Sequence, residues 1–296
     1  MEPIISVRDL YKIFKIGDTE VYALNGLNFD IYQGEFIAIV GTSGSGKSTC
    51  LNMLAGLEKP SKGSITITGE SIEKMNEKQL VAFRRMHVGF IFQSYNLIPF
   101  LNAMENVAMP LMFRGVSKEE RNKKALEYLE LMNIGKEANR SPNQMSGGQQ
   151  QRVGIARALV IDPEIIFADE PTGNLDSHTT EEVLALMRNI VEKQRKTLIM
   201  VTHDPHIASW ADRQLRVVDG RIVETVIRKE SKIEEEILRE NGAPPYTVVE
   251  KPVETVDFSE NPDNSESSEN SENLEASEAG QENQNAPKIK DKATKQ

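Results

Sequence analysis

Residues Gly41–Ser48 have the types and spacing that could hold the phosphates of a nucleotide. They read Gly-Thr-Ser-Gly-Ser-Gly-Lys-Ser and fit the P-loop pattern GxxxxGK[ST]. Glycines let the backbone wrap closely and point successive N–H groups at phosphate oxygens. Lys47 adds a positive charge, and the Ser48 hydroxyl can ligate Mg²⁺. The pattern predicts nucleotide binding but leaves kinase, GTPase and transport ATPase open. The expected binding loop comprises Gly41, Thr42, Ser43, Gly44, Ser45, Gly46, Lys47, Ser48 and Thr49.

A second motif is the apolar run Ile165–Ala168, which ends in the carboxylates Asp169 and Glu170. A carboxylate at the end of a strand can hold the Mg²⁺ shell, so we assign Asp169 to the metal. Glu170 lies one step further along, where it could orient or deprotonate a water that attacks the γ-phosphate. The alternative is an acidic N-cap for a helix that begins near Ser177. Because the motif accompanies a P-loop, we favour the catalytic interpretation.

The third motif, Met145–Gln149, precedes a predicted helix and reads Met-Ser-Gly-Gly-Gln. It resembles the signature of the ATP-binding cassette (ABC) family, usually LSGGQ, with Met in place of an apolar residue of similar volume. Ser146 and two glycines would expose N–H donors at a helix N-terminus, which forms a second anion site. The resemblance implies a homodimer of cassettes that sandwiches two ATP molecules. In it, Ser146, Gly147, Gly148 and Gln149 close on the γ-phosphate bound by the other protomer.

The same resemblance implies roles for residues outside these motifs. Gln93, after the predicted strand Gly89–Phe92, resembles the glutamine that senses Mg²⁺ and the attacking water. His203 resembles the histidine that contacts the γ-phosphate, and Asp176 resembles an aspartate at the dimer seam. Tyr11 resembles the aromatic residue that stacks on adenine. The implied catalytic residues are therefore Glu170, His203 and Gln93, and the implied metal ligands are Ser48, Gln93 and Asp169.

Longer strings indicate a branch of the family. GFIFQSYNLIP, MENVAMPL and QMSGGQQQRVGIARALVIDPEIIFADEPTGNLD look like cassettes of the macrolide-exporter and lipoprotein-releasing type. Those cassettes power four-span permeases from the cytoplasmic face of the membrane, in macrolide, lipoprotein or antimicrobial-peptide export. The alternative is a cell-division-type ATPase, which signals through a permease-like partner without transport. The apolar residues expected to form a groove for a permease helix are Phe90, Phe92, Tyr95, Leu97, Ile98, Pro99 and Phe100.

These motifs require elements that bring them together. Short apolar or β-branched runs alternate with stretches of helical spacing, which predicts an α/β core with a parallel sheet. The predicted strands are Phe36–Val40, Ile65–Thr68, Glu164–Ala168, Leu198–Thr202 and Gln214–Val218. The predicted helices are Lys47–Gly56, Lys118–Met132, Gly147–Val160 and Thr179–Lys193.

The predicted domain spans residues 1–228. Its first ~35 residues and Ser64–Gly69 indicate antiparallel strands, and residues 94–161, which contain no convincing strand, predict an inserted helical subdomain. The predicted fold class is therefore α/β: a P-loop NTPase core with an N-terminal antiparallel β subdomain and an inserted helical subdomain. The single cysteine, Cys50, cannot form an internal disulfide, which favours a reducing compartment.

The charge of the chain is concentrated at one end. The 296 residues include 35 Lys+Arg and 45 Asp+Glu, a net charge of −10, but 17 acidic and 8 basic residues lie in 229–296. We expect residues 229–240 to form a charged helical extension and residues 241–296 a disordered acidic tail. Lys47 and Asp169 are only 122 residues apart. That spacing leaves no room for the coiled coils of chromosome-maintenance relatives, so no nucleic-acid partner is expected. No apolar run approaches the ~18 residues of a membrane span.

Overall fold

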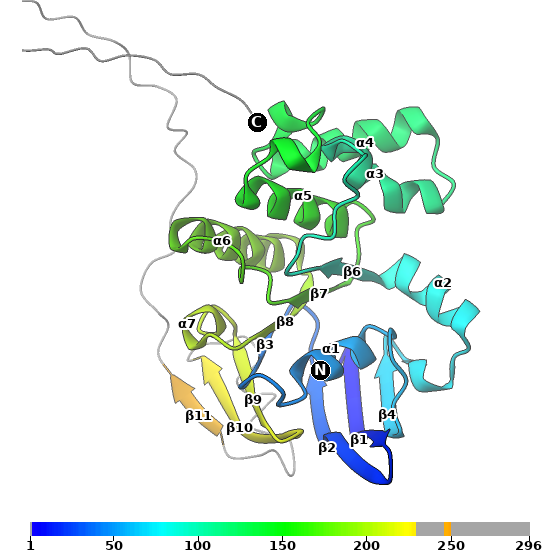
Figure 1. The fold of residues 1–296 in the computed structure, drawn as a ribbon, viewed down its shortest axis with the longest axis vertical. Coiled ribbons are helices and arrows are strands. Elements are labelled where there is room, and N and C mark those ends of the chain that lie inside the picture. The colour runs from blue at the N-terminus through cyan, green and yellow to red at the C-terminus, as the bar shows by residue number, and fades with distance from the viewer. Residues whose placement is uncertain (1, 229–245, 250–296) are drawn as a thin grey trace, which may run out of the picture. The chain divides into compact units, whose positions relative to one another are not determined.

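The computed structural model describes residues 2–228 and 246–249, which build two sheets and a group of helices (Figure 1). A seven-stranded sheet has the order β11-β10-β9-β3-β8-β7-β6. Its strands are β3 (Phe36–Val40), β6 (Val88–Ile91), β7 (Ile165–Asp169), β8 (Thr197–Thr202), β9 (Arg213–Val218), β10 (Arg221–Arg228) and β11 (Tyr246–Val249). Strands β6, β7, β8, β3 and β9 run parallel, which confirms the predicted parallel core.

The central strands bring the predicted motifs to one edge of this sheet. Val40 of β3 pairs with Thr202 of β8, and Asp169 of β7 pairs with Val201. The P-loop, the Asp169 carboxylate and His203 therefore all lie at the carboxyl ends of adjacent strands, where ligands bind in open α/β sheets. Nearly continuous burial along β3, β7 and β8 explains their unbroken apolar sequences.

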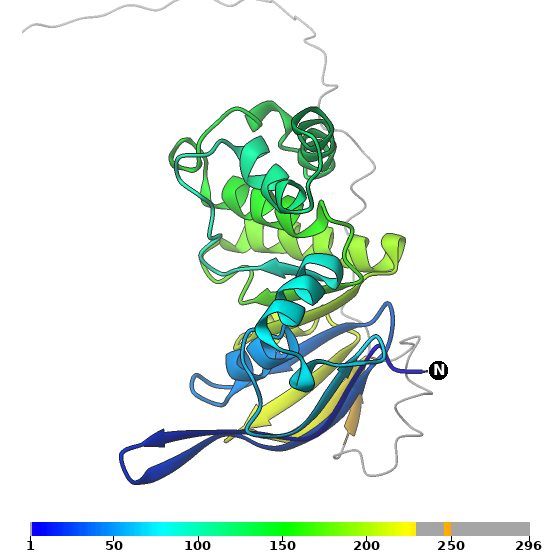
Figure 2. The ribbon, with the colours of Figure 1, turned by 90° about the vertical axis from the view of Figure 1, so that its right-hand side faces the viewer.

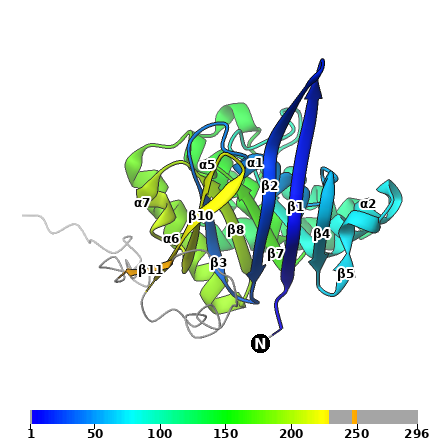
Figure 3. The ribbon, with the colours of Figure 1, turned by 90° about the horizontal axis from the view of Figure 1, so that it is seen from below.

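A four-stranded antiparallel sheet of order β2-β1-β4-β5 forms the predicted N-terminal β subdomain. Its strands are β1 (Ile5–Ile16), β2 (Thr19–Ile31), β4 (Lys62–Ile67) and β5 (Glu70–Ser71). The β1–β2 hairpin is long, and its tip extends beyond the neighbouring strands (Figures 2 and 3). Helix α1 (Lys47–Leu54) lies between this sheet and the core, and Cys50 within it is buried.

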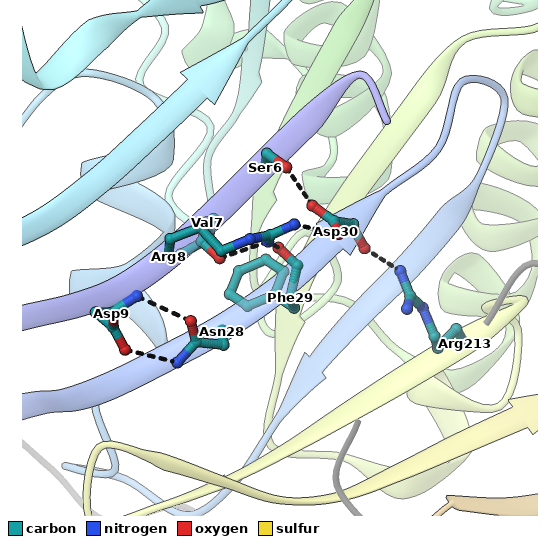
Figure 4. A network of polar contacts seen from close by, with 8 residues as sticks. All are labelled: Ser6, Val7, Arg8, Asp9, Asn28, Phe29, Asp30 and Arg213. Carbon is teal, nitrogen blue, oxygen red and sulfur yellow. Dashed lines mark hydrogen bonds and ion pairs between the residues drawn. The ribbon is translucent and has the colours of Figure 1, made fainter. Parts of the chain in front are cut away.

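A buried arginine joins the two sheets (Figure 4). Arg213, 1% exposed at the start of β9, donates through Nε to Glu35 Oε1 at 2.8 Å and through a terminal nitrogen to the Asp30 carbonyl. The Asp30 carboxylate in turn pairs with Arg8 of β1 at 2.6 Å. Burying charged groups is tolerated only when their hydrogen bonds are satisfied. These contacts therefore fix the antiparallel sheet against the core.

The helical elements confirm the predicted lobe and add to it. Within residues 94–161 lie α3 (Ala103–Phe113), α4 (Lys118–Leu131) and α5 (Gly147–Leu159), grouped beyond the β6 edge of the core sheet (Figure 1). Short 3₁₀ turns at Gly135–Glu137 and Pro142–Gln144 connect them, and another lies at Ile72–Lys74. The remaining helices are α2 (Glu77–His87), α6 (Ser177–Gln194) and α7 (Pro205–Ala208). Helices α2, α3 and α7 and strand β10 were not predicted individually.

The C-terminal predictions fall mostly outside the described residues. The charged extension over 229–240 and nearly all of the tail over 241–296 lie there. The exception is Tyr246–Val249, described as β11 and paired in parallel with β10. The aromatic and β-branched types of these four residues favour a strand. Among the described residues, no helix is both long enough and apolar enough to cross a bilayer.

Candidate functional site

The start of α1 leaves its first backbone amides without a side-chain cap. Gly46, at the N-cap position, has φ of 102°, and no side chain accepts a hydrogen bond there. A Cβ atom on Gly46 would lie 2.3 Å from the Ala23 carbonyl oxygen, so only glycine fits. Uncapped amides at a helix N-terminus attract anions such as phosphate.

These amides open into a pocket of about 600 Å³, a size suited to a small-molecule ligand. Four parts of the chain contribute its walls: Ala23 of β2, the P-loop with α1, the residue after β7 and the residue after β8. The lining residues are Ala23, Thr42, Ser43, Gly44, Gly46, Lys47, Ser48, Thr49, Glu170 and His203. The structure therefore brings most of the predicted binding loop together with two of the three predicted catalytic residues.

Lys47 supplies the positive charge of this pocket. Its side chain is buried, with 6% of the residue exposed, and Nζ donates to the Thr42 carbonyl at 2.7 Å. Burial lowers the pKa of Lys47, while the negative charges of Glu170 and Asp169 oppose that shift. Because Nζ is held by a neutral carbonyl, its charge remains available to an anionic ligand.

Asp169 and Ser48 place two hard oxygen atoms side by side. The Ser48 hydroxyl donates to Asp169 Oδ1 at 3.3 Å. Burial raises the pKa of Asp169; the neighbouring charge of Glu170 adds to that effect, while Ser48 and Lys47 counteract it. A divalent cation would relieve this unfavourable charge, and hydroxyl and carboxylate oxygens are the ligands Mg²⁺ prefers. Among the described residues, no cluster of three or more His, Cys, Asp or Glu could hold a metal.

Glu170 lies at the meeting point of the other predicted catalytic residues. His203 Nδ1 lies 2.9 Å from Glu170 Oε1, and Gln93 Nε2 lies 3.4 Å from Glu170 Oε2. Glu170 itself has a left-handed φ of 43°, and its amide donates to the Val201 carbonyl at 3.0 Å. A non-glycine residue adopts this left-handed backbone conformation only when its surroundings hold it, as is common at functional sites. The three side chains can together orient one small polar molecule.

The start of α5 differs from that of α1. Ser146 Oγ accepts from the Gln149 amide at 3.3 Å, and Gln149 Oε1 accepts from the Ser146 amide at 3.0 Å. These reciprocal bonds form a capping box. Residues 146–149, although all described, do not line the pocket at α1. The predicted second anion site therefore lies apart from the first within one chain.

Two further predicted residues also lie outside the pocket lining. Asp176 caps α6 by accepting from the Thr179 amide at 3.0 Å and the Thr179 hydroxyl at 2.7 Å, and these bonds lower its pKa. Tyr11 lies on β1, where its hydroxyl would be 2.9 Å from a Cβ on Gly26. Stacking of Tyr11 on adenine and a seam role for Asp176 remain predictions.

The site has supporting residues that the sequence reasoning missed. The Gly220 amide, in the turn between β9 and β10, donates to the Ser45 carbonyl at 3.0 Å and so supports the P-loop from behind. Gln151, fully buried on α5, donates to the Pro171 carbonyl at 2.5 Å, just after Asp169 and Glu170. Asp219-Gly220 between apolar runs is a hairpin signal that could have indicated the first contact. Nothing in the local sequence indicates the second.

A second pocket, of about 400 Å³, lies where α2, β6, α3 and α5 meet. Its walls combine aromatic and aliphatic side chains with three arginines. The lining residues are Arg84, Arg85, Val88, Gly89, Phe90, Phe92, Asn96, Met109, Pro110, Phe113, Arg157, Ala158 and Ile161. Of the predicted groove residues, Phe90 and Phe92 line it. None of the other five, Tyr95, Leu97, Ile98, Pro99 and Phe100, is fully buried.

Known proteins match this arrangement in sequence. A family model described as ABC transporter matches residues 24–173. An uncharacterized ABC transporter ATP-binding protein of Thermotoga maritima is 47% identical over 222 residues, covering 75% of this chain and 94% of that protein. The macrolide export ATP-binding/permease protein MacB of Wolinella succinogenes is 44% identical over 235 residues, covering 78% of this chain but only 36% of that protein.

Solved structures agree with the sequence comparison. A dimeric, post-hydrolysis structure of the ATP-binding cassette MJ0796, bound to ADP and Pi, matches with a TM-score of 0.70 and 43% identity. It covers 75% of this chain and 97% of that one. MJ0796 is from Methanocaldococcus jannaschii. These matches confirm the family resemblance expected from Gly41–Ser48 and Met145–Gln149. The chain belongs to the ABC transporter family, as one of its ATP-binding cassette ATPases.

Proposed function

We propose that the chain binds and hydrolyses ATP in order to power a permease, and that two copies act together. The phosphates of ATP lie on the amides of the P-loop, with Lys47 against the β and γ phosphates. The uncapped start of α1, which opens into the same pocket as Glu170 and His203, carries this proposal. Tyr11 stacks on the adenine base of the same molecule.

The residues of the site fit a bound Mg²⁺ ion. Ser48 and Asp169, whose oxygen atoms lie 3.3 Å apart, would hold it, with Gln93 as a further ligand. When bound, the ion neutralises phosphate charge. A site with few protein ligands suits Mg²⁺, which retains waters and shares substrate phosphates.

Glu170, His203 and Gln93 organise the attack of water on the γ-phosphate. The Glu170 carboxylate accepts a hydrogen bond from the water and directs it, while the Gln93 amide holds the carboxylate from one side. The His203 ring contacts both Glu170 and the pocket, so it can also contact the γ-phosphate. A carboxylate in this position can accept the proton that the water loses.

The second copy completes each ATP site. Ser146, Gly147, Gly148 and Gln149 lie outside the pocket of their own chain, so we place them against the γ-phosphate held by the partner subunit. Asp176 then lies at the seam between the two copies. The related MJ0796 cassette is described as dimeric, which supports this assembly.

The groove at α2, β6, α3 and α5 receives a cytoplasmic helix of the permease. Exposed apolar side chains at its rim, such as Phe113 at 60%, would be covered by such a helix. Arg84, Arg85 and Arg157 line the groove without any acidic side chain, which favours a helix that carries a carboxylate beside its apolar face.

The permease is of the macrolide-export type and is a separate chain, which places this protein at the cytoplasmic face of the membrane. The MacB relative, named an ATP-binding/permease protein, supports the export assignment. The Thermotoga relative, whose length this chain nearly spans, is named an ATP-binding protein. None of the relatives described favours the cell-division alternative.

The groove can be tested by charge substitution in the full chain. Phe113→Glu should release the protein from the membrane fraction of its own cells, while the ATPase rate of the purified variant stays unchanged. Ile16→Glu is the matched control, because Ile16 is 67% exposed on the distant β1–β2 hairpin. Retention of the Phe113→Glu variant on membranes would refute the proposal that the permease binds at this groove. A purified wild-type chain that binds but does not hydrolyse Mg-ATP would refute the ATPase role.

A further inference from the structure

Arg157 is buried on α5 without a carboxylate partner among the described residues. It is 7% exposed, and its guanidinium donates to two backbone carbonyls, those of Asn96 at 2.5 Å and Tyr95 at 2.7 Å. Burial lowers its pKa. An arginine buried without an anion does not favour stability, and an apolar residue of similar volume would suit the core better. The contacts of Arg157 therefore point to another purpose.

The two carbonyls belong to residues in an unfavourable backbone conformation. Tyr95 has φ of 59° and Asn96 has φ of 47°, both in the left-handed region that side-chain-bearing residues rarely adopt. A guanidinium presents its N–H groups in a rigid planar fork, so it can hold two adjacent carbonyls in one geometry. Lysine, with a single nitrogen, cannot reproduce that geometry. The shape of the 92–96 segment thus depends on Arg157.

These contacts lie on both sides of Gln93. The Phe92 ring precedes Gln93, and its centroid lies 5.9 Å from the Arg157 guanidinium carbon. Tyr95 and Asn96 follow Gln93 and accept the two hydrogen bonds. Arg157 therefore fixes the backbone before and after Gln93, whose amide lies 3.4 Å from the Glu170 carboxylate.

The same segment also contacts the opposite end of α5. The Tyr95 hydroxyl would lie 2.8 Å from a Cβ on Gly147, at the first turn of that helix. The Tyr95 side chain thus lies against Gly147 of the signature motif, and the Tyr95 carbonyl accepts a hydrogen bond from Arg157. The 92–96 segment and α5 form one unit, and Phe92, Asn96 and Arg157 also line the groove.

We propose that Arg157 is a positioning residue for ATP hydrolysis: it holds residues 92–96 on α5 so that the Gln93 amide stays against Glu170. This role rests on the proposed function, because it requires Glu170 to act on the attacking water. Arg157 itself touches neither ATP nor Glu170. A permease helix in the groove would touch the unit that carries Gln93.

The test compares Arg157→Met and Arg157→Lys in the full chain, with Mg-ATP hydrolysis measured at steady state. Arg157→Met should lower kcat about 100-fold, as expected for a misplaced catalytic group. KM should change less than about threefold, because the P-loop contacts remain. Arg157→Lys should fall between Arg157→Met and the wild type. The control is Arg152→Met on the same helix, where the arginine pairs with Glu182 at 2.7 Å, and its kcat should stay near the wild-type value.

A double-mutant cycle with Gln93→Ala separates positioning from general damage. If Arg157 acts through Gln93, adding Arg157→Met to Gln93→Ala should lower kcat no more than about twofold further. Multiplicative losses, or a wild-type kcat in Arg157→Met, would overturn the proposal. If Arg157→Met fails to fold, the same cycle is run with Arg157→Lys, and multiplicative losses again overturn it. Absence of hydrolysis in the wild-type chain would refute the proposed function instead.

Discussion

Two helices of this molecule begin with the same kinds of residue and yet present different surfaces. Helix α1 follows Gly44-Ser45-Gly46 and has no side-chain cap, so its first amides face the pocket. Helix α5 begins at Ser146-Gly147-Gly148, and the Ser146 and Gln149 side chains bond each other's amides. The first start is therefore free to bind phosphate groups as proposed, within one chain. At the start of α5, the Ser146 and Gln149 side chains already satisfy two backbone amides, and none of the predicted catalytic side chains lies beside them.

This difference shows that a glycine-rich helix start is only half of a nucleotide site. What makes α1 a site is the set of strand ends around it, which supply Asp169, Glu170 and His203. Those residues come from β7 and β8, far from the P-loop in sequence. The start of α5 lies in the helical lobe, and in the proposed assembly a second chain supplies such partners.

The largest effect is expected from a substitution in the pocket at α1. Glu170→Gln should lower ATP hydrolysis at least about 100-fold, because the amide cannot accept the proton of the attacking water. ATP binding should persist, since Lys47 and the P-loop amides are untouched. Rapid-mixing assays of phosphate release, with ATP affinity measured separately, check both parts. If Glu170→Gln hydrolysed ATP at the wild-type rate, Glu170 would have no role in hydrolysis.

A smaller effect is expected from substitutions that compare the two helix starts directly. Gly46→Ala should weaken ATP binding, because its Cβ would meet the Ala23 carbonyl at 2.3 Å and its φ of 102° disfavours alanine. Ser146→Ala removes a cap and should lower the free energy of unfolding by about 1 kcal/mol while leaving ATP affinity of the monomer intact. Chemical denaturation and nucleotide titration of both variants test this contrast. Equal loss of ATP affinity in the two would contradict it.

The smallest effect concerns the pH dependence of stability at the α1 site. Because the pKa of Asp169 is raised in the folded chain, its charged form is disfavoured there, and this residue favours folding less as pH rises. Asp169→Asn should therefore stabilise the nucleotide-free protein at pH 7, and the gain over wild type should shrink toward pH 4. Thermal unfolding across this range provides the measurement. If Asp169→Asn were less stable than the wild type at pH 7, burial would not be the dominant influence on the Asp169 carboxylate.

The sequence predicted the local parts of the site because each is encoded in a few consecutive residues. The P-loop and the carboxylates of β7 are examples, since strand, turn and helix signals surround them. The convergence of Gln93 and His203 on Glu170 came from the family resemblance and not from any spacing in the chain. The buried contacts of Arg157, Gln151 and Arg213 could not be predicted, because their partners lie far away in sequence and polar residues are ordinarily expected outside the core.

Some local signals in the sequence are compatible with two roles. Ser146 and Gln149 fit a capping box, in which Ser or Thr is followed three residues later by Gln or Glu, and the glycines between them also favour anion binding. Asn102 and Glu105 make the same kind of cap and begin α3, a helix that Pro110 obscured in the sequence. Helix boundaries inside the lobe were therefore less clear than its helical character.

The central claim is that each ATP site is built from α1 of one copy and α5 of another. Lys47→Ala and Ser146→Arg should each be inactive alone. In a mixture, half of the dimers are heterodimers, and each has one site with an intact Lys47 and an intact Ser146. The mixture should therefore recover about a quarter of the wild-type ATPase rate if the sites act independently. A mixture no more active than its separate components would contradict the account.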